Sequence, residues 1–239
     1  MSQYPYQSQP AWIDGRTAES QIRERAFIRS VYGWMSGGLL LTSLAAMWVV
    51  NSVNMQQLVL QNPVVRIGLM FAEIGIVIFL SVRLTKMSPA AAASAFLVYS
   101  LLNGLTLSVI FFAYTTATIY QAFGTAAGMF AVMSIFGTVT KKDLTSWGSF
   151  FMMGLFGVII CSVVNMFLHS APLGWVISLV GVFVFLGLTA YDTQKLKVMA
   201  TVTGPMQENF AVMGALRLYL DFINLFLFML RIFGGGRRS

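Results

Sequence analysis

Long runs of apolar residues, separated by short polar stretches, make up most of this chain. About 20 residues of apolar helix are needed to cross the ~30 Å hydrocarbon core of a membrane. Seven segments come close to this length, and they cover residues 31–50, 64–82, 90–114, 119–137, 147–168, 173–191 and 215–233. The pattern therefore predicts an all-α integral membrane protein with seven transmembrane helices.

The connections between these segments are short, and they contain residues that end helices. These residues are Asn62-Pro63, Ser88-Pro89, Lys141-Lys142-Asp143, Ala171-Pro172 and Gly204-Pro205. Short connections force neighbouring helices to run antiparallel. Gly33 with Gly37, and Gly124 with Gly128, have the spacing that allows close helix contact, so we expect helices to pack there.

The first 30 residues differ from the rest, because they are rich in Gln, Ser, Tyr, Pro and charged residues. They hold no apolar stretch of the kind found in a cleaved signal peptide. We expect residues 1–30 to form a polar, partly disordered cytoplasmic tail, in which residues 17–30 make a short helix against the membrane surface. Residues 31–239 are expected to form one seven-helix transmembrane domain.

Composition and charge agree with a membrane protein. Hydrophobic residues make up 57% of the chain and charged residues 10%, which excludes an ordinary soluble domain. The net charge of +7 does not indicate nucleic-acid binding, because the basic residues lie between apolar segments, where they set topology and contact anionic lipid head groups. The lipid bilayer is the expected partner, and no nucleic acid is expected.

Basic residues precede the first segment and follow the second, fourth and sixth, whereas the alternate connections lack them. By the positive-inside rule this places the N-terminus in the cytoplasm. With seven spans, Arg231 ends on the outer side, against the rule. A last segment that re-enters on the cytoplasmic side is therefore an alternative, but the length of residues 215–233 favours a full span.

Asp221 lies inside the last apolar segment, where a charge costs about 2.5–3.5 kcal/mol on insertion scales and needs a partner or water. Arg217, Asp221 and Asn224 fall at i, i+4 and i+7, so they form one polar stripe along the helix. The stripe indicates a polar lumen lined by Asp221 and Asn224. A local ion pair between Arg217 and Asp221 is the alternative.

Arg83, Asp192 and Asp221 are predicted to lie at one depth, near the inner boundary of the membrane. Two carboxylates and a guanidinium there would form a latch whose strength depends on protonation, since a second carboxylate disfavours ionisation and an arginine favours it. Such a latch would respond near neutral pH. Alternatively, Asp192 only ends its helix at the head-group level, in contact with water.

Glu73 lies midway along the second apolar segment, with no basic residue within one helical turn. It must be protonated, paired across helices or in contact with water, and Asn103 in the third segment is a candidate for lining the same path. Calcium takes six to eight oxygen ligands, so a calcium site at Asp192 and Asp221 would be weak. Passive passage of a cation fits this chain better than tight binding.

Four stretches resemble signature motifs of the Bax inhibitor-1 (transmembrane Bax inhibitor motif) family, bacterial branch. They are YSLLNGLTLS at 99–108, TKKDL at 140–144, GLTAYDTQKLK at 187–197 and LYLDFINLF at 218–226. The resemblance implies a seven-helix fold with the C-terminal helix surrounded by the other six. It also implies a pH-sensitive calcium leak, without a cofactor, in which a pair of aspartates controls the pore.

Within this resemblance, Asp192 and Asp221 match the family's paired aspartates. Glu73 matches an acidic position in the second helix, and Arg83 is the nearest match to the family's latch arginine. The resemblance also implies a location in the inner (plasma) membrane of a bacterium, with calcium as the permeant ion.

Two other functions fit the same residues. A regulatory membrane protein would act through a membrane protein partner without transport, and a proton-coupled transporter of a small solute would use Glu73 and the aspartates as proton carriers. An intramembrane aspartyl protease is disfavoured, because residues 218–221 lack the glycines of that motif, and we expect no enzymatic activity. The sequence favours no particular oligomeric state.

Overall fold

The computed structural model describes residues 18–83, 86–202 and 204–235, and every regular element in these ranges is helical. The elements are α1 (Ala18–Asn51), α2 (Val53–Gln56), the π-helical turn η1 (Gln57–Gln61), α3 (Pro63–Arg83), α4 (Pro89–Leu107), α5 (Ile110–Ala113), α6 (Thr116–Val139), α7 (Thr145–Leu168), α8 (Ala171–Met199) and α9 (Pro205–Gly234). In these ranges, seven helices are long and apolar enough to cross a membrane, with α4 and α5 together making the third. The predicted all-α, seven-span architecture is confirmed.

Several helices extend beyond the apolar segments that predict them. α1 begins at Ala18 and continues unbroken into the first span, so residues 18–30 are not a separate helix. α8 continues to Met199, and α9 begins at Pro205. Hydropathy marks only the part of a helix inside the hydrocarbon, whereas the helix continues until a cap or breaker ends it. The predicted disorder through residue 15 lies outside the described residues.

The third span is interrupted between α4 and α5. The hydroxyl of Ser108 donates a hydrogen bond to the carbonyl oxygen of Leu105 at 2.6 Å, and local bonding of this kind competes with the hydrogen bonds of the helix backbone.

Serine and threonine residues also mark the beginnings of helices. Ser88, Thr115 and Ser170 accept hydrogen bonds from backbone N–H groups three residues later and so cap α4, α6 and α8.

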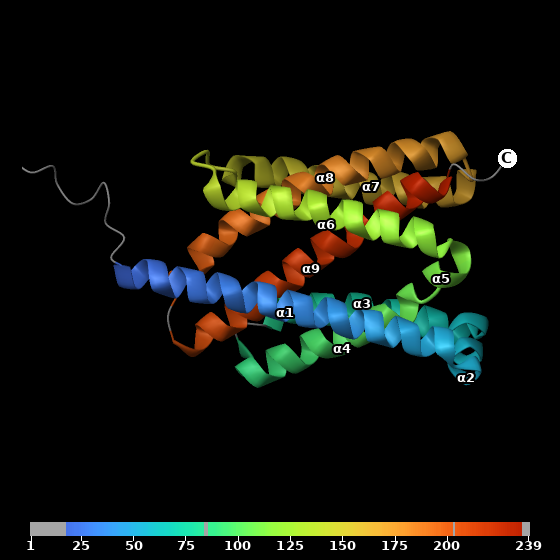
Figure 1. Cartoon of the computed structure of the whole chain (residues 1–239), viewed down its shortest axis with the longest axis horizontal. Coiled ribbons are helices and arrows are strands. Elements are labelled where there is room, and N and C mark those ends of the chain that lie inside the picture. Colours follow the sequence, from blue (N-terminus) through green and yellow to red (C-terminus); the bar gives the residue numbers. More distant parts are fainter. Residues whose placement is uncertain (1–17, 84–85, 203, 236–239) are drawn as a thin grey trace, which may run out of the picture.

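α9 is the central helix of the bundle. Figure 1 shows it running from the end where α1 begins to the opposite end, with α1, α3 and α4 on one side and α6, α7 and α8 on the other. It packs closely against α1, α4, α6 and α8. An apolar 18-residue stretch of α9 is 72% buried, compared with 6% for α3 and for α7. The C-terminal helix therefore supplies more of the core than any other helix.

Two glycines allow helices to approach closely. Gly104 of α4 lies against the backbone of Thr42 in α1, and Gly137 of α6 lies against the backbone of Ala190 in α8. A Cβ at either position would collide with a main-chain carbonyl. The four glycines for which the sequence predicts helix contact instead have open space at the Cβ position, because spacing within one helix does not specify which face meets a neighbour.

Candidate functional site

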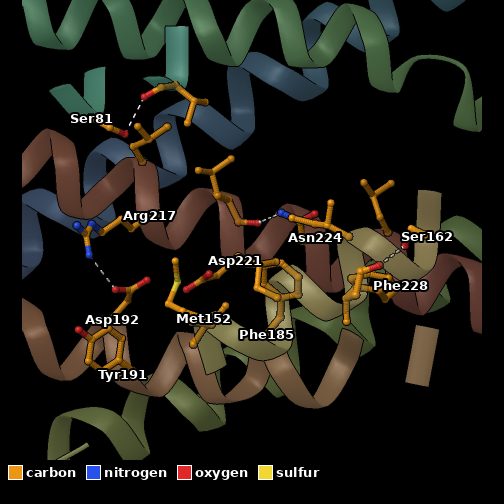
Figure 2. Close-up of a pocket in the computed structure, with 18 of the residues that line it drawn as sticks. Ser81, Met152, Ser162, Phe185, Tyr191, Asp192, Arg217, Asp221, Asn224 and Phe228 are labelled. Atoms are coloured by element: carbon orange, nitrogen blue, oxygen red, sulfur yellow. Dashed lines mark hydrogen bonds and ion pairs between the residues drawn. The ribbon is translucent and has the colours of Figure 1, made fainter. Parts of the chain in front are cut away.

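A cavity of about 820 Å³ lies between α3, α7, α8 and α9 (Figure 2). Its lining is mostly apolar, and its polar side chains are Ser81, Ser162, Tyr191, Asp192, Lys195, Arg217, Asp221, Asn224 and Arg231. Asp192, Asp221 and Asn224, which the sequence places at a pore or pH sensor, thus line one cavity. The polar stripe on α9 faces this space.

The cavity follows α9 for most of its length. The residues of α9 that line it run from Met213 to Arg231. At 1.5 Å per residue this distance is about 27 Å, close to the ~30 Å thickness of the hydrocarbon core. The part of α9 that lines the cavity is therefore nearly as long as the hydrocarbon core of a membrane is thick.

An ion pair joins the two helices that carry the acids. Arg217 Nη1 of α9 lies 3.3 Å from Asp192 Oδ1 of α8, and Figure 2 shows this contact at one end of the cavity. Asp192 is 9% exposed, so it is not the solvated helix end of the alternative interpretation. Arg217 and Asp221 do not form the local ion pair that the sequence offers as an alternative. The Arg217 guanidinium instead pairs with Asp192 of α8.

Asp221 lies beside this ion pair but takes no part in it. The residue is 4% exposed, and among the described residues its Oδ2 atom has no hydrogen-bond partner. Figure 2 shows the Asp192 and Asp221 side chains directed into the same space, and their charges interact. A buried carboxylate without a partner is costly. The charge state of Asp221 is therefore tied to those of Asp192 and Arg217.

Arg83 does not take part in this arrangement. It is exposed in the last turn of α3 and does not line the cavity, to which α3 contributes Val77 and Ser81. Two residues beyond Ser81 correspond to about 200° of rotation, so Arg83 faces away from that side of the helix. The arginine that reaches an aspartate is Arg217, from α9 itself.

Glu73 and Asn103 belong to a second polar group and not to the cavity lining. Asn103 Nδ2 of α4 donates to Glu73 Oε2 at 3.4 Å, and the Thr106 hydroxyl donates to Glu73 Oε1. Glu73 is thus paired across helices, one of the three states that its sequence allows. The Tyr219 hydroxyl donates to Asn103 Oδ1 at 3.0 Å and lies 2.6 Å from Thr42 Oγ1. This network connects α3, α4, α9 and α1.

The site offers little to a tightly bound metal ion. Among the described residues, no group of three or more His, Cys, Asp or Glu side chains is placed to hold a metal. The cavity holds two carboxylates, and Arg217 pairs with one of them. Calcium takes six to eight oxygen ligands. The two carboxylates of the cavity fall well short of this number of ligands.

The chain is similar to bacterial proteins over most of its length. A sequence model of the family described as "Inhibitor of apoptosis-promoting Bax1" matches residues 24–238. The inner membrane protein YbhL of Escherichia coli (strain K12) is 45% identical over 228 residues, covering 92% of this chain and 97% of YbhL. A protein of Borreliella burgdorferi is 42% identical, covering 93% of this chain and 98% of its own length. Every residue of the cavity falls within the matched family region.

Proposed function

Because this chain belongs to the Bax inhibitor-1 family, we propose that it is a passive leak pathway for cations, calcium foremost, which the ionisation of Asp192 and Asp221 controls. The observation that carries the proposal is the buried Asp221, unpartnered beside the Arg217–Asp192 ion pair in a cavity along the central helix. Passive transport, without catalysis or a cofactor, is the proposed activity.

In the proposed closed state Asp221 is protonated. Arg217 is then free to bond Asp192, and this ion pair holds α9 to α8. Ionisation of Asp221 would place a second negative charge in the cavity and draw the guanidinium away from Asp192. The contact between α8 and α9 would weaken, and the cavity would attract cations more strongly. Flux is therefore expected to rise as the pH increases.

The charges that line the cavity support the same direction. Lys195, Arg217 and Arg231 are the basic side chains of the lining, and two aspartates oppose them. When both aspartates are ionised they offset two of these positive charges, and when both are protonated they offset none. The electrostatic barrier to a cation is thus lower at higher pH.

We propose that the protein lies in a bacterial inner membrane with its N-terminus in the cytoplasm. It is a multi-pass membrane protein by its seven apolar helices, and its relative YbhL is an inner membrane protein. The basic residues after α3 and α6 support the orientation, because they lie at the same end of the bundle as the start of α1.

The deciding experiment is calcium flux into liposomes that contain the purified full chain, measured at about pH 6, 7 and 8. Asp221→Asn and Asp192→Asn are compared with Asp143→Asn, an exposed acid outside the spans. Hydrogen bonds from Thr145 hold the pKa of Asp143 below its ordinary value, so its charge is constant over this range. Flux equal to that of empty liposomes for every variant would exclude the calcium leak.

That negative outcome would favour the two other functions. A regulatory protein that acts through a membrane protein partner would bind that partner equally well as wild type and as Asp221→Asn. A proton-coupled transporter would move its solute only with a pH gradient, and Glu73→Gln would uncouple the two. The network around Glu73 is the observation that supports this second possibility.

A further inference from the structure

A second hollow lies between α1 and α6, on a different side of the bundle from the aspartate cavity. It measures about 500 Å³ and is lined by Tyr32, Met35 and Ser36 of α1 and by Phe130, Ala131, Ser134, Ile135, Thr138 and Val139 of α6. Both helices pack on α9, which Figure 1 shows passing between them. We call this hollow the α1–α6 groove. It lies at the end of the bundle where α1 begins and α6 ends.

The lining of the α1–α6 groove has both apolar and hydroxyl groups. Met35, Phe130 and Ile135 provide apolar surface, as a hydrocarbon chain requires. Ser134 is 6% exposed, and its hydroxyl has no hydrogen-bond partner among the described residues. A buried hydroxyl without a partner costs free energy. An occupant of the groove with a polar atom at this depth would satisfy the hydroxyl of Ser134.

Basic residues continue from the groove toward the membrane surface. Arg25 and Arg29 precede Tyr32 by seven and three residues, so they lie on the same face of α1 as this groove residue. Lys142 follows the end of α6 closely. Lys197 of α8 donates a hydrogen bond to the carbonyl oxygen of Thr138 in the groove wall.

These cations are available to an anion. Arg25, Arg29 and Lys142 are exposed, and within the described ranges the ion pairs formed involve other residues. From the surface inward, the basic side chains therefore come first, and the groove beyond them is lined by hydroxyl groups and apolar side chains together. A phospholipid has the complementary arrangement of a phosphate followed by ester oxygens and acyl chains.

We propose that the α1–α6 groove is a binding site for an anionic phospholipid. The acyl chain lies between α1 and α6, an ester oxygen accepts a hydrogen bond from Ser134, and the phosphate lies near Arg29 and Lys142. A zwitterionic lipid is disfavoured, because its amine would lie among these basic side chains. The site is independent of the proposed leak, since it shares no lining residue with the aspartate cavity.

The test is native mass spectrometry of the full chain from nanodiscs with equal amounts of phosphatidylglycerol and phosphatidylcholine of the same acyl chains. The wild type should retain phosphatidylglycerol in preference, by about fivefold for each basic side chain that contacts it. Arg29→Gln with Lys142→Gln should abolish the preference. Arg66→Gln, an exposed arginine at the start of α3 and the opposite end of the bundle, is the matched control and should keep it.

A second variant tests the groove itself. Ala131→Trp would fill it from an exposed position on α6, and retention of either lipid should fall to the background level. Equal retention of the two lipids by the wild type would overturn the proposal. So would an equal loss of preference in Arg66→Gln, because that result would mean a general effect of surface charge. The exposed substitutions Arg29→Gln and Lys142→Gln keep the test decisive if Ala131→Trp fails to fold.

Discussion

The hydroxyl of Tyr219 donates a hydrogen bond to Asn103 Oδ1 at 3.0 Å, and this bond ties the central helix to α4 inside the bundle. Tyr219 is fully buried and also lies 2.6 Å from Thr42 Oγ1 of α1. Three spanning helices thus meet at one phenol. No water is available inside a bilayer to replace a lost bond, so this contact should matter for stability.

Tyr219→Phe is expected to destabilise the protein by about 1 kcal/mol, because it leaves Asn103 Oδ1 without its donor and keeps the ring packing. Thermal unfolding in detergent would measure the change. Tyr120→Phe is the matched control, since Tyr120 is 73% exposed on α6 and should alter stability little. Equal shifts in the two variants would contradict a structural role for the network.

Arg217→Gln should raise the leak at low pH and weaken its pH dependence, because it removes the ion pair that holds α9 to α8. The loss of stability should be about 1 kcal/mol, since the arginine is partly exposed. Calcium flux in liposomes provides the measurement. Arg83→Gln serves as the comparison and should behave as the wild type, whereas the reverse result would restore Arg83 as the latch.

Asp221→Asn should give a low flux that no longer changes between about pH 6 and 8, because the amide imitates the protonated acid at every pH. Asp192→Asn should also flatten the profile, but at a higher flux, since it removes the negative charge that pairs with Arg217. The two variants are therefore expected to differ in the level of calcium flux and to agree in the slope of flux against pH. A wild-type slope in Asp221→Asn would reject this acid as the sensor.

Glu73→Gln should fold with nearly wild-type stability, because an amide can still accept a hydrogen bond from Asn103. Glu73→Leu removes both acceptors and should cost about 1 kcal/mol. A thermal unfolding series of the two variants checks this order. If the leucine variant is as stable as the glutamine variant, the bonds that Glu73 accepts contribute nothing to the fold.

The orientation of the chain can be tested with single cysteines, after Cys161 of α7 is replaced by serine. Asn54→Cys should react with a membrane-impermeant maleimide on intact spheroplasts, whereas Lys142→Cys should react only after permeabilisation. Both positions are exposed, so the difference reports the side of the membrane and not burial. The opposite labelling pattern would reverse the proposed topology.

The number and type of the helices could be predicted from the sequence, because crossing a bilayer imposes a length and a composition on each segment. The ends of α1, α8 and α9 could not, since they lie beyond the hydrocarbon, where polar residues continue the helix. The interruption at Ser108 was also missed, because one serine in an apolar run leaves the hydropathy of the segment almost unchanged.

The candidate site could be predicted only in part. The spacing of Asp221 and Asn224 identifies a polar face on α9, and that face does line the cavity. The partner of Arg217 depends on how α8 is rotated against α9, which no spacing within one helix specifies. Tyr219 and Thr42 were missed because single hydroxyl groups in apolar helices have no periodic signal; only the depth that they share with Asn103 relates them.

The central position of α9 has a consequence for how the protein is made. A ribosome delivers the other six spans to the membrane before it delivers the helix on which α1, α4, α6 and α8 pack. Until then, lipid or the insertion machinery must cover the faces that will meet α9, including the hydroxyl of Thr42. Assembly of the core is therefore a late step, and a chain that stops after α8 should be recognised by membrane proteases as unfinished.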